Sequence, residues 1–277
     1  MLYRSKLKWI GRYVAGKKVL DLGCVCHQLD ISNPPWLHGY ICERAKSALG
    51  VDILPEELQE LQRRGFNVVL ADVETMDLGE QFDVIVAGDI IEHLADHGAF
   101  LERARAHLNP GGLLLITTPN PVTLVRLLRT LGRGDTPAHH QHTCWFTAKV
   151  LRQLAERYGF EAVDESYADD TRIYYRLWPA ISLRGGPLRR SWRRLRVLVK
   201  RLLWRPLICA NSLLCLIRPG CAETLCMAFR YPRREGPIQT PPAGDALCRA
   251  ESQTGRGPTR ASAATGASPT ACTRASR

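Results

Sequence analysis

Five short apolar runs, separated by polar stretches, constrain the fold more than any other feature of the sequence. They lie at residues 18–22, 48–52, 67–71, 82–87 and 113–118. Apolar runs of this length are typical of strands buried on both faces of a parallel sheet. Their alternation with helical stretches predicts an α/β fold with a doubly wound sheet. Ligands bind such sheets at the carboxyl ends of the strands, so the residues that follow each run are the candidate site.

The remaining segments are assigned from periodicity and from turn-forming residues. We expect helices at residues 2–15, 36–47, 55–64, 90–108 and 147–158, with a break near Gly98, and a further helix at 122–131 inside a long loop at 119–144. Pro55 suits the first turn of its helix, where no backbone N–H is needed. The run Asn109-Pro110-Gly111-Gly112 predicts a tight turn. Two later strands are expected at 160–166 and 223–229.

Acidic residues and a glycine follow the first three runs. Gly23 would let the backbone approach a ligand closely. Asp21 could orient the following loop through backbone N–H groups, and the alternative is an ordinary acid at a strand end. Asp52 lies where a carboxylate can accept hydrogen bonds from ribose hydroxyls. Asp72 could accept from an adenine amino group, although its surroundings also suit a solvated turn.

Five motifs in order resemble those of class I S-adenosylmethionine-dependent methyltransferases. They read VLDLGC from Val19, GVDI from Gly50, ADVETMDL from Ala71, FDVIVAGDIIEHL from Phe82 and LNPGGLLLITTPN from Leu108. The likeness covers roughly residues 15–165 and is greatest to the small-molecule branch, with ubiquinone-biosynthesis-type and glycan-cluster methyltransferases. It implies a Rossmann-like seven-stranded sheet, mostly parallel, in which 160–166 and the antiparallel last strand, 223–229, form a pair.

The resemblance also implies the cofactor, S-adenosyl-L-methionine, and the residues that bind it. These are Asp21, Gly23 and Cys24 near the methionine part, Asp52 and Ile53 at the ribose, Asp72 and Val73 at the adenine, and Gly88 and Asp89 beside the cofactor. The chain departs from the usual GCGxG form, because Gly23-Cys24-Val25-Cys26-His27 lacks the second and third glycines. Buried, inert thiols at glycine positions are favoured over a redox-active pair.

Histidines are the candidates for proton transfer. His93 follows Glu92 at the start of an expected helix, and a capping or core role is at least as plausible as catalysis. In the resembling family a His-x-x-aromatic-Phe-Ser/Thr pattern often lies over the substrate pocket, and His142 fits that pattern, so it could contact the acceptor or act as a base. His139 and His140 lie close by, but no acid or thiol occurs at helical ligand spacing, so no metal is expected.

Basic charge is concentrated in one late segment. Residues 1–170 carry 18 Lys/Arg and 23 Asp/Glu, whereas 171–222 carry 12 Lys/Arg and no acid. Within an insert at 178–220, the stretch 188–205 predicts a basic amphipathic helix that suits an anionic membrane surface. Docking on its own domain and binding RNA phosphates are the alternatives. Nucleic acid is disfavoured, because 87–89 reads Ala-Gly-Asp rather than the Asn/Asp-Pro-Pro-aromatic pattern of many nucleobase methyltransferases.

These features lead to one main hypothesis. Residues 1–230 form a methyltransferase domain that methylates a small-molecule or lipid/glycan-linked acceptor, most plausibly at oxygen. The tail at 231–277 has almost no large apolar residue, so we expect it to be disordered. The start of the chain lacks the apolar run of a signal peptide, which favours a cytoplasmic protein. The basic helix at 188–205 would place that protein peripherally at the inner face of the membrane. The alternative is a catalytically inactive binding or membrane-adaptor protein on the same fold. A nicotinamide dehydrogenase is disfavoured, because no GxGxxG follows the first run.

Overall fold

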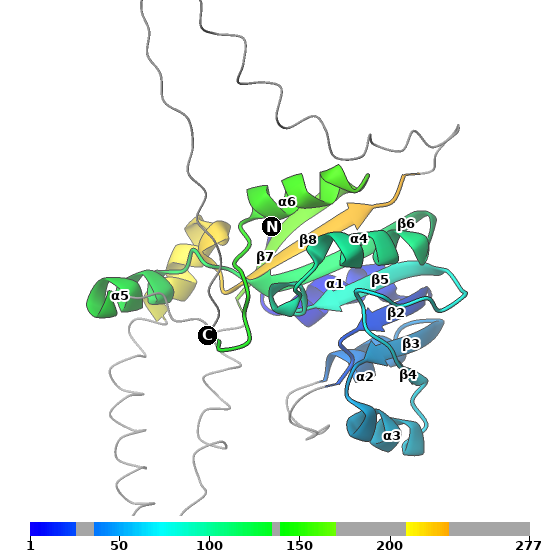
Figure 1. Ribbon diagram of the computed structural model, residues 1–277. Helices are drawn as coiled ribbons and strands as arrows, with labels where there is room; N and C mark the ends of the chain where they lie inside the picture. The colour runs from blue at the N-terminus through cyan, green and yellow to red at the C-terminus, as the bar shows by residue number, and fades with distance from the viewer. Residues whose placement is uncertain (26–35, 135–138, 170–208, 233–277) are drawn as a thin grey trace, which may run out of the picture. The chain divides into compact units, whose positions relative to one another are not determined.

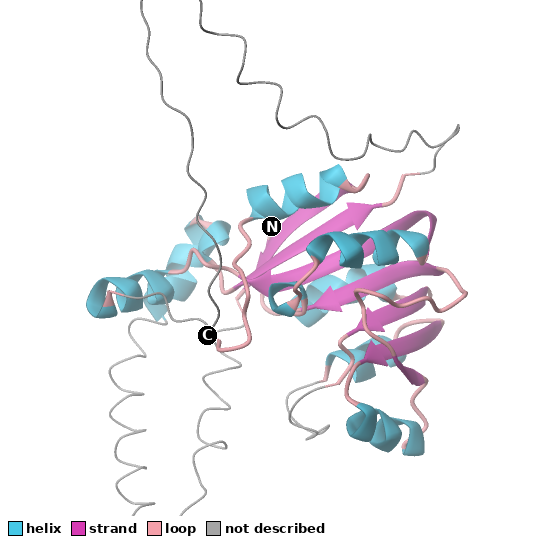
Figure 2. Cartoon of the chain, in the orientation of Figure 1, coloured by secondary structure: helices cyan, strands magenta, loops and turns pink. Residues whose placement is uncertain are grey.

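A single sheet organises the molecule. The computed structural model describes residues 1–25, 36–134, 139–169 and 209–232. The chain divides into two units, Met1–Arg234 and Glu235–Arg277, and every described residue belongs to the first. That unit contains an eight-stranded sheet of order β1-β7-β8-β6-β5-β2-β3-β4, with helices on both faces (Figures 1 and 2). The predicted Rossmann-like α/β fold is confirmed.

Five parallel strands form the half of the sheet that the apolar runs predict. They are β2 (Lys18–Leu22), β3 (Ser47–Asp52), β4 (Val68–Leu70), β5 (Phe82–Gly88) and β6 (Leu108–Pro119). The central strand β2 pairs with both β3 and β5. The carboxyl ends of these strands therefore meet at one edge of the sheet, and the strand order reverses between β2 and β5, where ligands bind in folds of this kind.

The predicted antiparallel strands are present. They are β7 (Glu161–Ala168) and β8 (Thr224–Arg230), and β8 lies between β6 and β7, antiparallel to both. An eighth strand was not predicted: β1 (Leu2–Tyr3) pairs in parallel with the edge of β7. The expected helix at 2–15 is therefore wrong at its start. Ser5 begins α1 (Lys6–Val14) instead, because its side chain accepts the N–H of Leu7.

The other helices connect the strands. They are α2 (Leu37–Cys42), α3 (Pro55–Arg63), the 3-10 turn η1 (Ile91–His93), α4 (His97–Ala106), α5 (Leu124–Arg133), α6 (Ala148–Arg157) and η2 (Pro219–Cys221). Residues 209–217 are also helical. The expected helix at 36–47 is shorter, because β3 begins at Ser47. The expected helix at 90–108 breaks before Gly98, because Glu74 Oε1 accepts the N–H groups of Ala95 and Asp96.

The Asn109–Gly112 run is not a hairpin-like turn but an irregular part of β6. Phe82 of β5 pairs with Leu108, and Val84 pairs with Leu113, so β6 contains extra residues at this point. Gly111 adopts a φ of 85°, and its N–H donates to the Tyr231 carbonyl at 2.7 Å. Glycine is needed here because other residues rarely adopt that backbone conformation.

Two buried layers hold the helices against the sheet. Ile85 and Ala87 of β5 face one layer, where Phe100 of α4 and Leu151 of α6 pack. Val84 and Val86 of the same strand face the other layer, which contains Trp9 of α1 and Ile41 of α2. The alternation along β5 matches the period of a strand, and burial of each large side chain contributes about 1.5–3 kcal/mol.

Two predicted segments, the basic insert and the C-terminal tail, lie largely outside the described residues. Most of the insert at 178–220, including 188–205, and almost all of the tail at 231–277 lie outside the described residues. Within the described ranges, every helix is too short or too polar to span a membrane.

Candidate active site

A tight turn follows β2 at the carboxyl edge of the sheet. Gly23 has a φ of 74°, and the N–H groups of Gly23 and Cys24 donate to the Val51 carbonyl at 2.9 and 3.1 Å. A Cβ atom at Gly23 would lie 3.1 Å from the Ile90 side chain. Both the backbone conformation and the close packing therefore explain why glycine occupies this position.

Asp52 holds the loop that follows β2. Its Oδ2 accepts the N–H of Val25 at 2.9 Å, and its Oδ1 accepts the N–H of Ile53 at 2.8 Å. The residue is only 9% exposed. A carboxylate has about four acceptor positions, so two remain for a ligand. The neighbouring Ile53 is 63% exposed at the same strand end and offers a ligand an apolar contact.

Asp21 has a different partner from the loop N–H groups considered for it. Its Oδ2 lies 3.0 Å from Nδ1 of His38, and both side chains are fully buried. Burial raises the pKa of Asp21. Burial also opposes protonation of His38, but the contact with Asp21 raises the pKa of His38 to about 9. The pair therefore retains its shared proton at neutral pH.

Cys24 is buried directly beside this pair. Burial, together with the nearby acids, raises the pKa of its thiol, which makes it unreactive. A Cβ atom on Gly50 would lie 2.8 Å from the Cys24 sulfur and 2.7 Å from Cε1 of His38. The interpretation of Cys24 as an inert thiol at a glycine position agrees with this packing, whereas Cys26 and His27 lie outside the described residues.

Asp72 and Val73 lie at the end of β4 in a turn. Asp72 is exposed, and its Oδ1 accepts the N–H of Glu74 at 2.9 Å. Val73 is buried in the core beside Met76. The structure thus contains the solvated turn that was the alternative interpretation of Asp72, and an adenine contact stays a prediction.

The end of β5 presents a constrained carboxylate. Asp89 has a φ of 54°, which is uncommon for a residue other than glycine. Its Oδ1 accepts from the Thr117 hydroxyl at 2.8 Å, and it forms an ion pair with the Lys6 ammonium of α1. Burial works against the charged form, yet Lys6 holds the pKa of Asp89 below its usual value. At the preceding residue, a Cβ atom on Gly88 would collide with Leu37 at 2.4 Å.

Glu92 lies one turn further on and is 1% exposed. Its Oε2 accepts from the Thr118 hydroxyl at 2.9 Å. Its Oε1 has no hydrogen-bond partner among the described residues and lies 4.0 Å from Nε2 of His93. Burial, and then the negative charge of Asp89, raise the pKa of Glu92 to about 8. A carboxyl group with such a pKa can both take up and release a proton near neutral pH.

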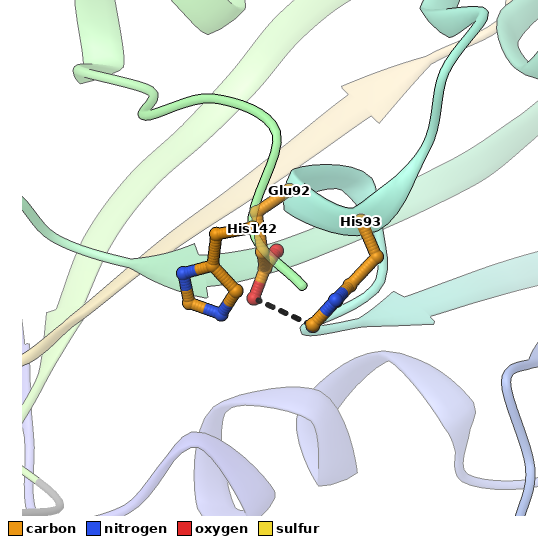
Figure 3. Close-up of side chains that lie close together, drawn as sticks. All are labelled: Glu92, His93 and His142. Carbon is orange, nitrogen blue, oxygen red and sulfur yellow. Dashed lines mark ion pairs between the residues drawn. The ribbon is translucent and has the colours of Figure 1, made fainter. Parts of the chain in front are cut away.

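His142 approaches Glu92 and His93 from a distant part of the sequence (Figure 3). The rings of His93 and His142 lie 4.8 Å apart, centroid to centroid. Thr143 fixes the His142 loop against η1, because its N–H donates to the Glu92 carbonyl at 2.8 Å and its hydroxyl to the Leu94 carbonyl at 2.9 Å. Burial, and then the neighbouring His93, lower the pKa of His142.

The cluster of Glu92, His93 and His142 joins both histidines predicted for proton transfer to an acid that was not selected. One ligand atom of each residue lies within 4.8 Å of the others, and this is the one group of its kind found within the described ranges. The lack of an acid at helical ligand spacing to the loop histidines does not exclude a metal, because the fold brings Glu92 to His142 from 50 residues away. A carboxylate and two imidazoles can pass a proton between them, and the same donor set suits a divalent cation.

Three residues that contribute to this site were missed by sequence reasoning. Glu92 was overlooked beside His93, although its place in the GDIIEHL motif could have marked it. His38 and Lys6 carried no signal, because their partners, Asp21 and Asp89, are distant in the sequence. The other two histidines of the loop, His139 and His140, are exposed at the rim of the cluster.

Comparison with known proteins gives the family. A family model described as a methyltransferase domain matches residues 4–165, which is more than half of the chain. The chain belongs to this methyltransferase family. The resemblance to class I S-adenosylmethionine-dependent methyltransferases is thereby confirmed, and S-adenosylmethionine is the cofactor of the family.

Several curated relatives match this chain. A ubiquinone biosynthesis O-methyltransferase of Nitrobacter winogradskyi is 30% identical over 172 residues, covering 55% of this chain and 60% of that protein. One of Rhodopseudomonas palustris is 50% identical over 117 residues, covering 39% and 41%. A probable S-adenosylmethionine-dependent methyltransferase of Mycolicibacterium smegmatis is 31% identical over 160 residues, covering 54% of each. The chain spans about half the length of these relatives.

Two solved structures share the fold of this chain at a TM-score of 0.51. A putative sarcosine dimethylglycine methyltransferase from Galdieria sulphuraria is 16% identical and aligns over 82% of this chain and 86% of that chain. The cyclase SpnF is 14% identical and aligns over 83% and 80%. At these identities the likeness concerns the fold alone, and the chemistry must be argued from the site.

Proposed function

We propose that this chain transfers the methyl group of S-adenosylmethionine to a hydroxyl oxygen of a small-molecule or lipid/glycan-linked acceptor. Oxygen is favoured because two of the relatives described above are named O-methyltransferases. The observation that carries the proposal is Oε1 of Glu92 beside His93 and His142, which accepts no hydrogen bond from the described residues. A hydroxyl acceptor must lose a proton when it is methylated, and this oxygen can take it.

The residues at the carboxyl edge fit the cofactor. Asp52 retains two acceptor positions for the ribose hydroxyls, and Ile53 would contact the adenosine part. Gly23 leaves no side chain over the end of β2, where the methionine part would lie. When bound, the cofactor supplies an electrophilic methyl group. The protein then needs chiefly to hold acceptor and donor in line, which is the main contribution of positioning to catalysis.

Glu92 is the proposed proton acceptor. Its Oε1 takes the proton of the acceptor hydroxyl, while the Thr118 hydroxyl keeps the carboxylate in place through Oε2. His93 and His142 flank the same oxygen and can carry the proton towards solvent, because both side chains are partly exposed. Thr143 keeps the His142 loop attached to η1 during this step.

Calorimetric titration of the purified protein with S-adenosylhomocysteine tests the first requirement. Wild type and Glu92→Gln should both bind, and Asp52→Asn should bind more weakly. Lack of binding by wild type would instead favour the inactive binding or adaptor protein. Mass spectrometry of metabolite and lipid extracts, incubated with S-adenosylmethionine and either wild type or Glu92→Gln, should then show a methyl-sized mass increase with wild type only.

We further propose that the protein lies peripherally on an anionic membrane surface, at the inner face of the membrane. Support comes from α5 and the helix at 209–217, which expose most of their large apolar side chains. The exposed apolar residues in this region are Val122, Leu127, Leu128, Leu131, Leu213, Leu216 and Ile217. Arg126 of α5 pairs with Glu223 at 3.0 Å, which ties α5 to the segment that follows the second helix.

Charge makes an anionic lipid the expected partner of this surface. α5 contains three arginines and no acid, and the acid-free segment 171–222 carries 12 Lys/Arg. Each basic residue near an anionic bilayer contributes about 1 kcal/mol, and apolar side chains add to the affinity. The predicted basic amphipathic helix at 188–205 belongs to the same acid-free segment. We therefore expect it to bind the same membrane as the exposed apolar side chains of α5 and 209–217.

Vesicle pelleting tests the membrane proposal. Wild type should pellet with phosphatidylglycerol-containing vesicles and much less with phosphatidylcholine alone or at high salt. Leu128→Asp combined with Leu131→Asp, or deletion of 188–205, should abolish pelleting. Leu70→Asp is the control, because Leu70 on β4 is 59% exposed, between Leu128 at 44% and Leu131 at 74%. Equal pelleting of all these proteins would contradict the proposal.

A further inference from the structure

The imidazole of His142 is held in place by the rings around it. Its Nδ1 is buried and has no hydrogen-bond partner within the described ranges. Three rings lie close to it instead, at centroid distances of 4.8 Å (His93), 5.5 Å (His139) and 5.6 Å (Trp145). His139 is exposed, whereas Trp145 is half-buried and meets the imidazole nearly at right angles, at 84°. The direction in which His142 points at Glu92 therefore depends on the position of Trp145.

Trp145 is in turn in contact with an arginine of α5. The guanidinium carbon of Arg126 lies 4.6 Å from the centroid of the Trp145 ring, which is within the range of a cation–π interaction. We propose that Arg126 is a positioning residue of the active site, which holds Trp145 against His142 and so keeps the His142 imidazole directed at Glu92. This inference rests on the proposed function, in which His142 carries a proton from Glu92 towards solvent.

Arg126 is well placed for this role because both its backbone and its side chain are fixed. Its N–H donates to the Thr123 hydroxyl oxygen at 3.1 Å, which caps the start of α5. Its guanidinium pairs with Glu223 at 3.0 Å, and the Arg126 side chain is only 17% exposed. The Glu223 carbonyl accepts the N–H of Asn120, directly after β6, at 2.8 Å. A planar guanidinium held by such an ion pair can still stack on an aromatic face, which a lysine ammonium cannot do.

The charge of Arg126 supports the same assignment. Burial, and then the neighbouring cations, lower the pKa of His142, and Arg126 is one of these cations. A neutral imidazole can accept a proton, so the arginine favours the form of His142 that the proposed function needs. The titratable and charged groups that face His142 are Glu92 and His93 of η1, His139 of the same loop, Arg126 of α5 and Asp89 after β5.

NMR of the histidine side chains tests the contact without any cofactor or acceptor. The Cε1–H signal of His142, assigned by its loss in His142→Gln, is shifted by the ring current of Trp145 in the wild-type protein. Trp145→Leu should therefore move this signal, and Arg126→Leu should move it in the same direction. Adding the second change to the first should move the signal little further, because both changes act on one contact.

Two further variants complete this experiment. Arg152→Leu is the matched control, because Arg152 is another helical arginine that pairs with a glutamate, Glu165, at 2.8 Å. It should leave the His142 signal in place. Arg126→Lys keeps a positive charge for Glu223 but has no flat face for the indole, so it should also move the signal, even if Arg126→Leu does not fold. An unchanged His142 signal in a folded Arg126 variant, or an equal shift in Arg152→Leu, would overturn the proposal.

Methyl-transfer kinetics test the consequence for the reaction. Arg126→Leu and Trp145→Leu should each lower kcat about tenfold, because a displaced proton carrier slows the step without altering binding. The affinity for S-adenosylhomocysteine should stay at the wild-type value. The double variant should lose no more than the larger single loss, since the two residues act through one imidazole. Single losses that multiply in the double variant would mean that Arg126 and Trp145 act separately, which would overturn the proposal.

His142→Gln separates this inference from the proposed function. Its loss in kcat should be at least as large as that of Arg126→Leu. Full activity of His142→Gln would contradict the proposed role of His142 in proton transfer, and a wild-type protein without methyl transfer would contradict the proposed function as a whole. In both cases the NMR comparison would still decide whether Arg126 positions His142 through Trp145.

Discussion

The Thr118 hydroxyl donates to Oε2 of Glu92 at 2.9 Å, and Oε1 of the same carboxyl group is left 4.0 Å from Nε2 of His93. Thr118 lies near the end of β6 and Glu92 lies in η1, so the contact joins two strand ends of the sheet. One oxygen of Glu92 therefore has a structural role and the other is available for chemistry.

The first prediction concerns the pH dependence of methyl transfer. Glu92 must be ionised to accept a proton, and its pKa is raised to about 8 by burial and by Asp89. Below that pKa, kcat/KM should rise about tenfold per pH unit, and above it the profile should level off. Glu92→Gln should lose about 10²–10⁴-fold in kcat and keep cofactor affinity.

These rates should be measured with a chelator present. A flat pH profile, or a Glu92→Gln variant with normal kcat, would contradict the role of Glu92 as base. Activity that disappears with the chelator and returns with an added divalent cation would show that the cluster acts through a bound metal instead.

Thr118→Val tests how the second oxygen of Glu92 tunes this profile. The Thr118 hydroxyl stabilises the charged carboxylate, so its removal should raise the pKa of Glu92 further. A hydrogen bond of about 1 kcal/mol corresponds to a shift of somewhat less than one pH unit. The midpoint of the kcat/KM profile should therefore move to higher pH. An unchanged midpoint with reduced kcat would mean that Thr118 positions the acid without tuning it.

Asp52→Asn should weaken binding of S-adenosylhomocysteine by about 10–100-fold, because hydrogen bonds to a charged group contribute about 1.5–3 kcal/mol. The same change also weakens the hold on Val25, whose N–H donates to Oδ2. Asp72→Asn is the control, because Asp72 is exposed and accepts within its own turn. Calorimetry that shows equal losses for both variants would argue against a special role for Asp52.

Lys6→Met should destabilise the protein in a pH-dependent way. Lys6 holds the pKa of Asp89 below its usual value, so the pair stabilises the folded state above the unfolded pKa of Asp89 and ceases to do so as pH falls through the folded pKa. The loss should be about 1–2 kcal/mol near neutral pH and smaller in acid. Thermal melts of both proteins across this range measure the difference, and a loss independent of pH would point to packing instead.

Gly50→Ala should destabilise the fold by about 1–3 kcal/mol, because the new Cβ would overlap the Cys24 sulfur and the His38 ring. Gly132→Ala, in α5, is the matched control, since nothing lies within 4 Å of its added Cβ. The control should be neutral or slightly stabilising. Denaturant unfolding compares the two, and equal stability would mean that the Cys24–His38 packing yields at little cost.

Much of the sheet could be predicted because its strands are locally encoded. β2 has the predicted bounds, since the stretch from Lys18 to Leu22 is mainly apolar and lies between a glycine-terminated helix and a glycine turn. β1 could not be found, because two residues have no periodicity and the pairing with β7 depends on residues 167–168. Asn109–Gly112 has the composition of a turn, but the flanking Leu108 and Leu113 pair with β5, and Gly111 and Gly112 hydrogen-bond to Tyr231, so the run lies within β6.

The site was less predictable than the sheet, because most of its contacts join residues that are distant in the sequence. Asp52 and Gly23 follow their strands directly, so their position at the carboxyl edge follows from the strand assignment. The Asp21–His38 and Lys6–Asp89 pairs join residues 17 and 83 positions apart, and no local pattern marks them. The fold alone decides that Glu92 meets His142, so an argument from ligand spacing along the chain could not detect the cluster.

The hydrogen bonds from Thr143 to the carbonyls of Glu92 and Leu94 have an evolutionary consequence. They attach the loop that contains His142 to the backbone of the segment that follows β5. The other side chains of that loop can therefore diverge, or be exchanged with those of a relative, without disturbing the strand ends that carry Asp52 and Gly23. Acceptor preference could change rapidly in such a lineage while the donor side stays the same.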